Sequence, residues 1–427
     1  MSKLAIFGGP KTISAPFEAY NSIGKEELEA AKVVLETGVL SKYLARWGPD
    51  FCGGKQVRAF EDEWSKYFNV SHSVVVNSNT SGLIAALGAI GIEPGDEVIV
   101  SPWTMSASAT SILVWNAIPV FADIEDATFN LDPVSIISNI TPYTRAIMVP
   151  DIFGHAADLD AIMDIASKYG LRVIEDNAQS PAALYRNQYV GTVADIGVFS
   201  LNYHKHIHTG EGGVCVTNDP ILAERMQLIR NHAEGAVEEK GVTNLSNMIG
   251  FNFRLTEIQA AIGREQLKKL PALVAERQKA AERLTEGIRD LPGLRPPVIR
   301  PNCTHVYYAY PLIYDPAVSG VPKAKILAAL QAEGVTAISG SYANVHLFPM
   351  FQQRMAYGTK GFPWSAEFYK GKVSYEKGIC PMAEALQDEK YMGIEMCKYR
   401  YEDQDVDLLI AAFRKVWAHM SVLKSDD

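Results

Sequence analysis

The sequence predicts an α/β fold in which helices cover both faces of a mostly parallel sheet, followed by a smaller α+β C-terminal domain. Three observations support this prediction. Six short apolar runs lack polar alternation, which is typical of strands buried on both faces. Segments of helical periodicity separate these runs, and strands that alternate with helices form parallel sheets. A proline-rich link follows the longest helical segment, and the last third alternates less regularly.

The predicted strands are residues 74–76, 97–100, 147–149, 171–174, 196–199 and 214–216. One stretch, residues 98–122, has no charged residue and is long enough to span a bilayer. Because it contains Pro102 and Pro119, it predicts strand, turn, short helix and strand instead of a membrane span. Ligands of open parallel sheets bind beyond the carboxyl ends of the strands, so we expect the functional site there.

Four helical segments accompany these strands. Apolar residues recur at helical spacing over residues 57–68 and 159–166, and Gly170 ends the second of these segments. Helical periodicity dominates residues 256–288, and an amphipathic helix over residues 406–420 closes the chain.

The domain boundary is expected within the long helical segment and the proline-rich link after it. We divide the chain into a large domain of residues 1–270 and a small C-terminal domain of residues 271–427. Residues 351–375 are rich in Gly, Lys and aromatic residues without periodicity, and they predict a surface excursion.

Composition and charge narrow the functional class. The 427 residues are 48% hydrophobic and 21% charged, which is typical of a globular enzyme and excludes disorder for most of the chain. The net charge is −9 and no Lys/Arg run exceeds two residues, so we expect no nucleic-acid or membrane partner. The five cysteines form no C-x-x-C pair and the N-terminus lacks a signal-peptide profile, which together predict a cytoplasmic protein.

The densest chemical signal is the loop between the last two predicted strands. Lys205 lies at its centre, and a glycine-rich run follows at residues 210–213. A lysine held at the mouth of a sheet is a candidate Schiff-base nucleophile, because burial lowers its pKa. Taken alone, a loop lysine is more often a solvated surface charge.

Two other strand ends carry polar residues. Asp176 follows a buried strand, with Gln179 three residues later. A carboxylate there is either a helix N-cap or the partner of a cofactor's pyridinium nitrogen. Farther upstream the chain runs from strand into helix through Asn79 and Thr80. Backbone N–H groups at such a helix start bind phosphate well, although simple N-capping explains the same residues.

In their order, these motifs resemble the DegT/DnrJ/EryC1/StrS family of sugar aminotransferases, which depend on pyridoxal 5'-phosphate (PLP) and have the aspartate-aminotransferase fold, fold type I. The family's phosphate turn is similar to residues 78–83, with Asn79 where glycine is usual. Its G-D-E-V-I-V run, E-D-x-A-Q segment, lysine loop and G-x-N-x-R segment resemble residues 95–100, 175–179, 200–213 and 250–261. The five motifs, in the family's order, extend the resemblance over nearly the whole chain.

The resemblance implies two catalytic residues. Lys205 would hold PLP as a Schiff base and then move a proton between the substrate and the cofactor. Asp176 would keep the pyridine nitrogen protonated, so that the ring withdraws electrons. No metal site is implied.

The resemblance also implies residues that bind the cofactor. Gln179 would donate a hydrogen bond to the phenolate oxygen of the ring. Ser200 and the turn around Asn79 and Thr80 would bind the phosphate. Asn252 would reach the phosphate from the neighbouring subunit, which implies a homodimer with shared active sites.

The sequence departs from the family pattern above the ring. Where the family usually places an aromatic residue over the cofactor, this chain has Met105. A thioether packs well on an aromatic face, so Met105 is expected to bind the cofactor there, with Trp103 as the alternative.

Three histidines surround the lysine, at positions 204, 206 and 208. Alternating histidines are compatible with a metal site. In an extended loop, however, they would point to one side and Lys205 to the other, and no Cys or carboxylate cluster accompanies them, so we expect none. A histidine beside the lysine would instead orient the substrate or relay a proton.

The function implied by the resemblance is transamination in amino-sugar biosynthesis: an amino group moves from glutamate or glutamine to the keto group of a sugar nucleotide or cyclitol. The first alternative is a PLP- or PMP-dependent ketosugar dehydratase of the same family, in which histidine replaces the lysine. The second is a PLP-binding regulatory protein, which needs a DNA-binding segment that this sequence lacks. Glu211 and Arg254 are expected to be structural or subunit-contact residues.

Overall fold

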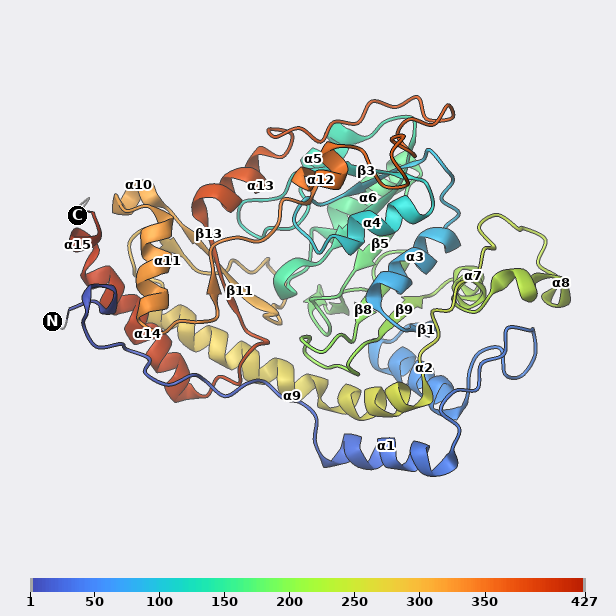
Figure 1. Ribbon diagram of the computed structural model, residues 1–427, viewed down its shortest axis with the longest axis horizontal. Helices are drawn as coiled ribbons and strands as arrows, with labels where there is room; N and C mark the ends of the chain where they lie inside the picture. The colour runs from blue at the N-terminus through green and yellow to red at the C-terminus, as the bar shows by residue number, and fades with distance from the viewer. Residues whose placement is uncertain (1–2, 425–427) are drawn as a thin grey trace.

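The computed structural model describes residues 3–424 and consists of a large α/β region joined to a smaller α+β region (Figure 1). A seven-stranded sheet forms the centre of the large region. In spatial order its strands are β1 (His72–Val76), β9 (Gly213–Thr217), β8 (Ile196–Ser200), β5 (Arg172–Asp176), β4 (Thr144–Pro150), β2 (Glu97–Val100) and β3 (Ile118–Phe121). The six predicted strands are confirmed, and β3 is the second strand expected within residues 98–122.

The sheet is mostly parallel. All pairings from β3 through β2, β4 and β5 to β8 are parallel, whereas β9 runs antiparallel to both β8 and β1. The carboxyl ends of β4, β5 and β8 therefore meet at one edge. In the register Pro150 lies beside Asp176, which in turn lies beside Val198.

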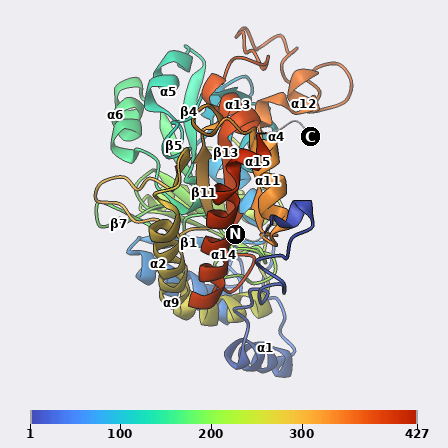
Figure 2. The same ribbon diagram turned by 90° about the vertical axis from the view of Figure 1, so that its left-hand side faces the viewer.

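Helices cover both faces of this sheet, because successive strand residues point to opposite sides. Val74 and Val76 belong to one core with α3 (Asn79–Ala89), α4 (Ala107–Val114) and α7 (Pro220–Arg230). Val75 belongs to a second core with α2 (Lys55–Phe68), α6 (Leu159–Tyr169) and the start of α9 (Glu257–Ile288), and α5 (Pro133–Asn139) lies on the same side (Figure 2). The predicted helices at 57–68 and 159–166 are confirmed as α2 and α6.

The small region has its own sheet and core. Its antiparallel strands are β10 (Leu294–Arg295), β11 (Ala309–Tyr314), β13 (Tyr391–Glu395) and β12 (Ile338–Ser339). Helices α10 (Pro316–Ser319), α11 (Lys323–Ala332), α14 (Asp403–Ala418) and α15 (Met420–Leu423) complete it. The predicted C-terminal amphipathic helix is confirmed, since α14 buries Val406, Leu409, Phe413 and Trp417.

Helix α9 connects the two regions. Its N-cap Thr256 accepts a hydrogen bond from the Gln259 backbone, which forms a capping box with the Gln259 side chain. The first half of α9 packs in the large region and the residues from Ala280 onward pack in the small core. The predicted helix over 256–288 is confirmed, whereas the division of the chain at residue 270 falls inside α9 and stays a prediction.

The remaining segments lie at the periphery. Helix α1 (Lys25–Thr37) packs along α9 at the bottom of Figure 1. Short elements α8 (Val237–Lys240), α12 (Pro349–Gln352), α13 (Pro381–Ala385) and the hairpin of β6 (Leu184–Tyr185) and β7 (Gln188–Tyr189) lie in the connections. Within residues 3–424, no helix is both long and apolar enough to cross a bilayer.

Residues 351–375 contain almost no regular structure, as predicted, but the expectation that they form only a surface excursion is wrong. The Tyr369 hydroxyl donates to Glu97 at 2.7 Å, and the Tyr375 hydroxyl donates to the Pro119 carbonyl at 2.8 Å. Both aromatic side chains are buried against the ends of β2 and β3. The segment therefore closes the edge of the core, which aromatic residues achieve without any periodicity.

Candidate active site

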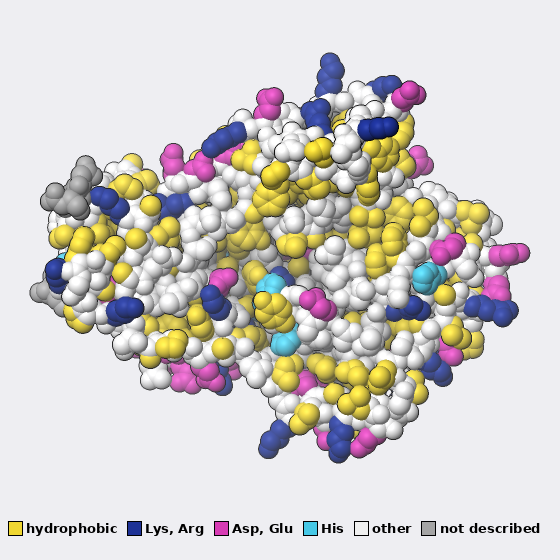
Figure 3. Space-filling view, viewed as in Figure 1, with side chains coloured by type: hydrophobic (Ala, Val, Ile, Leu, Met, Phe, Trp, Pro, Cys, Tyr) yellow, Lys and Arg dark blue, Asp and Glu magenta, His cyan; other side chains and the backbone are white. Residues whose placement is uncertain are grey.

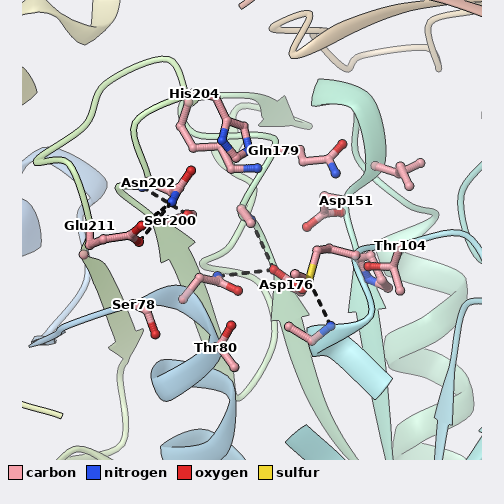
Figure 4. Close-up of a pocket in the computed structure, with 18 residues that line it drawn as sticks. Ser78, Thr80, Thr104, Asp151, Asp176, Gln179, Ser200, Asn202, His204 and Glu211 are labelled. Carbon is pink, nitrogen blue, oxygen red and sulfur yellow. Dashed lines mark hydrogen bonds between the residues drawn. The ribbon is translucent and has the colours of Figure 1, made fainter. Parts of the chain in front are cut away.

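A pocket of about 160 Å³ opens at the carboxyl ends of β4, β5 and β8 and at the first turn of α3. The structure brings seven of the eight predicted site residues to this pocket: Asn79, Thr80, Met105, Asp176, Gln179, Ser200 and Lys205 (Figure 4). The eighth, Asn252, does not line it. Residues that lie up to 126 positions apart in the sequence therefore meet where the sheet topology predicts a ligand site.

Lys205 is buried within a loop of consecutive turns. Its side chain is 7% exposed, and its backbone N–H donates to the Asn202 carbonyl at 3.0 Å. Its ammonium nitrogen lies 4.2 Å from the centre of the Tyr308 ring. Burial lowers the pKa of Lys205 to about 8, against the attraction of Asp176, which acts in the opposite direction. This lysine is therefore partly unprotonated, and nucleophilic, near neutral pH.

Asp176 ends β5 with its carboxylate held by three groups. Ser108 donates to one oxygen at 2.6 Å, while the Ala178 backbone and the Asn79 amide each donate to the other at 3.3 Å. Burial raises the pKa of Asp176, and these hydrogen bonds together with Lys205 oppose that rise. The result is a fixed, buried carboxyl group that faces the pocket.

The contact with Asn79 explains the departure from glycine at this position. The Asn79 amide donates to Asp176 and also to the Val198 carbonyl at 3.2 Å. Asn79 thus links the start of α3 to the ends of β5 and β8. A glycine would leave the helix start in place but would remove both bonds.

The first turn of α3 presents backbone N–H groups to the pocket. Ser78 is the N-cap and accepts from the Ser81 backbone, while Thr80 lines the pocket. The close approach of this turn to the start of β9 depends on Gly213, where a Cβ would lie only 2.7 Å from the Ser78 carbonyl carbon. With the hydroxyl of Ser200 across the pocket, this turn forms an anion-binding corner.

Gln179 links the pocket to the small region. Its side-chain oxygen accepts from the Phe153 backbone at 2.8 Å, and its amide donates to the Tyr342 hydroxyl at 3.0 Å. The amide keeps a second N–H for a ligand. Tyr342 lies in the chain after β12, so the wall of the site on this side comes from the small region.

Met105 and Trp103 have separate positions. Met105 lines the pocket, is 61% exposed and accepts a hydrogen bond at its sulfur from the Ala107 backbone. Trp103 is buried, stacks on Phe129 with ring centres 5.8 Å apart and donates to Asn344 at 2.8 Å. Trp103 is thus a core residue, and Met105 is the one of the two that lines the pocket.

The loop around Lys205 is not extended, so the arrangement that an extended loop would give the three histidines does not arise. The loop is a series of turns, in which His204 lines the pocket together with Lys205. His206 is buried and donates to the Val306 carbonyl at 2.8 Å, while His208 accepts from the Gly210 backbone at 3.3 Å. Within the part of the chain that the structure describes, no group of three His, Cys, Asp or Glu residues is arranged to hold a metal ion.

Asn252 lies outside the pocket on the strand-like segment before α9. Its side-chain oxygen accepts from Arg254 at 2.7 Å, and its backbone carbonyl accepts from Asn77 at 3.3 Å.

Glu211, which was expected to be structural, lines the pocket and accepts two hydrogen bonds of 2.9 Å from Asn202. Glu211 therefore orders the loop that carries the lysine.

Sequence reasoning missed Ser108 and Asp151. Asp151 follows β4, is 1% exposed, and one of its carboxyl oxygens accepts from the Ala157 backbone at 3.0 Å. The other oxygen has no partner within the described residues. Burial, with Glu175 and Asp176 nearby, raises the pKa of Asp151 well above its usual value. Its position after a buried strand, like that of Asp176, was the available signal.

The chain is similar to known proteins over most of its length. The DegT/DnrJ/EryC1/StrS aminotransferase family matches residues 24–392. The chain is 34% identical over 358 residues to the spore coat polysaccharide biosynthesis protein SpsC of Bacillus subtilis, which covers 82% of this chain and 89% of that protein. It is 32% identical over 440 residues to the L-glutamine:2-deoxy-scyllo-inosose aminotransferase of Streptoalloteichus tenebrarius. That match covers 99% of this chain and 99% of the relative.

Solved structures have the same fold. DesV of S. venezuelae, in complex with a ketimine intermediate, is 29% identical with a TM-score of 0.76, covering 92% of this chain and 94% of that one. A GDP-4-keto-6-deoxymannose-3-dehydratase with a trapped PLP-glutamate geminal diamine shares the fold alone. It is 23% identical with a TM-score of 0.74, covering 94% of this chain and 100% of that one.

Proposed function

This chain belongs to the DegT/DnrJ/EryC1/StrS aminotransferase family, and from that premise we propose that it moves an amino group from glutamate or glutamine to the keto group of a sugar nucleotide or cyclitol. It is a PLP-dependent transaminase. The observation that carries the assignment is the buried lysine opposite a buried aspartate in one pocket.

The donor set of the pocket fits PLP. A buried amine of lowered pKa suits the aldehyde, a buried carboxylate suits the pyridinium nitrogen, and the anion-binding corner of Thr80 and Ser200 suits the phosphate. Gln179 has a spare N–H for the phenolate oxygen, and Met105 is placed to pack on the ring face.

When bound, PLP supplies an electron-withdrawing ring that stores the amino group between the two halves of the reaction. Lys205 Nζ takes the proton from Cα of the donor and later returns a proton to the carbon of the acceptor. Asp176 would accept a hydrogen bond from the protonated ring nitrogen, and Ser108 and Asn79 donate to its carboxylate and fix its orientation.

Asn252 is proposed to act in the neighbouring subunit. It does not line the pocket of its own chain, and the resemblance assigns it to a partner's phosphate. The functional unit would then be a homodimer with shared sites, the commonest symmetry for soluble oligomers.

The second candidate is a ketosugar dehydratase, and the observation that favours it is His204, which lines the pocket beside Lys205. Burial lowers the pKa of His204 to about 4, so the imidazole is neutral near neutral pH. A histidine cannot form a Schiff base with the cofactor, whereas a lysine can. The presence of Lys205 therefore favours transamination.

Isotope transfer separates these two functions. The enzyme receives glutamate or glutamine labelled with heavy nitrogen, together with a panel of ketosugar nucleotides and keto-cyclitols. We expect heavy nitrogen in the acceptor product. A deoxygenated sugar without nitrogen, accompanied by ammonia, would show that the chain is a dehydratase.

A further inference from the structure

A second and larger cavity, of about 690 Å³, lies between the lysine loop and the small-region sheet. In the space-filling view the molecule is hollowed near the middle of this face, between the two regions (Figure 3). His204 lines both this cavity and the smaller pocket. Tyr308, also in its lining, places the centre of its ring 4.2 Å from the ammonium nitrogen of Lys205. Under the proposed function this cavity holds the substrates, because its wall reaches the amine of the lysine.

Tyr342 lies where this cavity meets the cofactor pocket. It follows β12 in the chain and lines the cavity, and its hydroxyl oxygen accepts a hydrogen bond from the Gln179 amide at 3.0 Å. Gln179 itself lines the smaller pocket. The hydroxyl of Tyr342 is therefore one hydrogen bond away from the residue that is proposed to bind the phenolate oxygen of PLP.

Phe153 fixes the direction of this hydrogen bond. Its backbone N–H can only donate, and it donates to the side-chain oxygen of Gln179 at 2.8 Å. The amide nitrogen of Gln179 therefore faces Tyr342, and an amide nitrogen can only donate. Because the Tyr342 oxygen is the acceptor in this bond, the hydrogen of its own hydroxyl is not used there and can be donated to a ligand in the cavity.

The Tyr342 hydroxyl is a donor and not a base near neutral pH. Burial raises the pKa of Tyr342 to about 12, against the hydrogen bond from Gln179, which lowers it. The phenol therefore keeps its hydrogen over the pH range in which the amine of Lys205 loses its proton, since the pKa of that lysine is about 8.

Packing against the large region holds the Tyr342 ring in position. Its centre lies 5.1 Å from that of Phe153, edge to face, and 5.9 Å from that of Trp103. The Tyr342 backbone N–H donates to the Gln387 side chain at 2.8 Å, and Asn344 accepts from the Trp103 indole at 2.8 Å. The hydroxyl is thus positioned before a ligand binds, so that binding orders few further groups.

The chemistry of PLP places the amino donor beside this hydroxyl. The phenolate oxygen and the aldehyde of PLP stand on adjacent ring carbons, so a residue that binds the phenolate oxygen lies next to the place where the amino group is transferred. In an amino-acid donor the carbon that gives up this amino group also bears the α-carboxylate. Glutamate and glutamine share that group, whichever of them is the donor.

We propose that the hydroxyl of Tyr342 binds the α-carboxylate of the amino donor, and that Gln179 orients this hydroxyl by donating to its oxygen. The proposal rests on the proposed function. A hydrogen bond to the carboxylate fixes one substituent of the donor's Cα, which limits the orientations in which the Cα hydrogen meets Lys205 Nζ.

A pair of unreactive ligands tests this contact on the PLP-loaded enzyme. The first is 2-methyl-L-glutamate, and the second is 4-amino-4-methylpentanoate, in which a methyl group replaces the α-carboxylate. Neither has a hydrogen on the reacting carbon, so Lys205 has no proton to take and the absorbance of PLP reports binding alone. The corresponding amides, 2-methyl-L-glutamine and 4-amino-4-methylpentanamide, are measured in the same way.

Tyr342→Phe keeps the ring and removes the hydroxyl. We expect this variant to bind the carboxylate ligands about tenfold or more weakly than the wild type, because hydrogen bonds to charged groups are strong. The dissociation constants of the methyl ligands should change by less than about twofold, because they have no carboxylate to lose. Tyr310→Phe is the matched control, since it removes a buried hydroxyl that bonds Thr285 at 2.7 Å outside the cavity lining. It should change neither constant.

Three results would overturn the inference while leaving the transaminase intact. They are unchanged binding of the carboxylate ligands by Tyr342→Phe, equal weakening of both kinds of ligand, and loss of PLP binding by this variant. In each case the hydroxyl serves the fold or the cofactor, or nothing, and not the donor's carboxylate. If the absorbance of the wild-type enzyme responds to neither glutamate nor glutamine, the proposed function itself fails, and the inference with it.

Discussion

The hydroxyl of Ser108 donates to a carboxylate oxygen of Asp176 at 2.6 Å, and both residues are buried. Ser108 belongs to the first turn of α4, whereas Asp176 ends β5. The bond lowers the pKa of Asp176 and so opposes the upward shift that burial causes. Ser108 therefore helps to keep Asp176 ionised for the cofactor.

Replacing Ser108 by alanine should remove this hydrogen bond and raise the pKa of Asp176. Without the bond the pKa of Asp176 rises further, so the acid side of the activity profile should move to higher pH. Hydrogen bonds to buried charges contribute about 1.5–3 kcal/mol, which corresponds to a loss of about tenfold or more in kcat/KM at neutral pH. The measurement is the pH profile of kcat/KM. Ser138→Ala, at an exposed position of α5, is the control, and an unshifted profile for Ser108→Ala would count against the role.

Removing the charge of Asp176 should have a larger effect. Asp176→Asn keeps the shape but leaves no anion opposite the ring nitrogen, so kcat should fall on the order of 10²–10³-fold. Steady-state kinetics with saturating PLP measure this. Asp126→Asn, on the exposed surface, serves as the control. Near-normal turnover of the Asp176 variant would show that the carboxylate is only a structural cap.

The lowered pKa of Lys205 predicts how the PLP-free protein recombines with PLP. Only the unprotonated amine bonds the aldehyde, so the rate should rise with pH and level off above about 8. An ordinary lysine, with a pKa of 10.5, would give a rate that still rises at about pH 9. Stopped-flow absorbance over this pH range distinguishes the two, and a continued rise would refute the buried position of the amine.

A shared active site predicts complementation between two inactive variants. Lys205→Ala and Asn252→Ala should each be nearly inactive as homodimers, but subunit exchange should produce hybrids with one intact site. Random mixing in equal amounts should restore about a quarter of the wild-type activity. Sedimentation should show a dimer. If the mixture stays inactive while exchange is demonstrated, Asn252 does not act in the partner's site.

The strands were predictable from the sequence, and so were the positions of Asp176 at a strand end and of Lys205 in a loop between strands. Buried strands and loop motifs are local patterns. Ser108 was not predictable, since it lies 68 positions before Asp176 in a helix without charged residues, where nothing distinguishes it from the neighbouring Ser and Thr. Tyr342 meets Gln179 across 163 positions, and that contact depends on how the small region packs against the large sheet. Periodicity carries no information on such packing.

The loop of Lys205 shows a second limit. An extended loop would separate the lysine from its histidines. In the structure the buried His206 instead donates to the Val306 carbonyl, and the turns bring His204 and Lys205 to the same pocket. The contact that decides the loop comes from a residue 100 positions later. The burial of aromatic residues within 351–375 was not predictable for the same reason. Their hydrogen-bond partners lie on strands that are distant in the sequence.

Chemical labelling is the most direct test of the assignment of Lys205 as the residue that binds PLP. The holoenzyme is reduced with borohydride, digested and mapped by mass spectrometry, with the Lys205→Arg variant treated in parallel. This assignment predicts a pyridoxyl group on Lys205 alone and none on the variant. A pyridoxyl group on another lysine of the wild-type enzyme, or unchanged labelling of the variant, would contradict it.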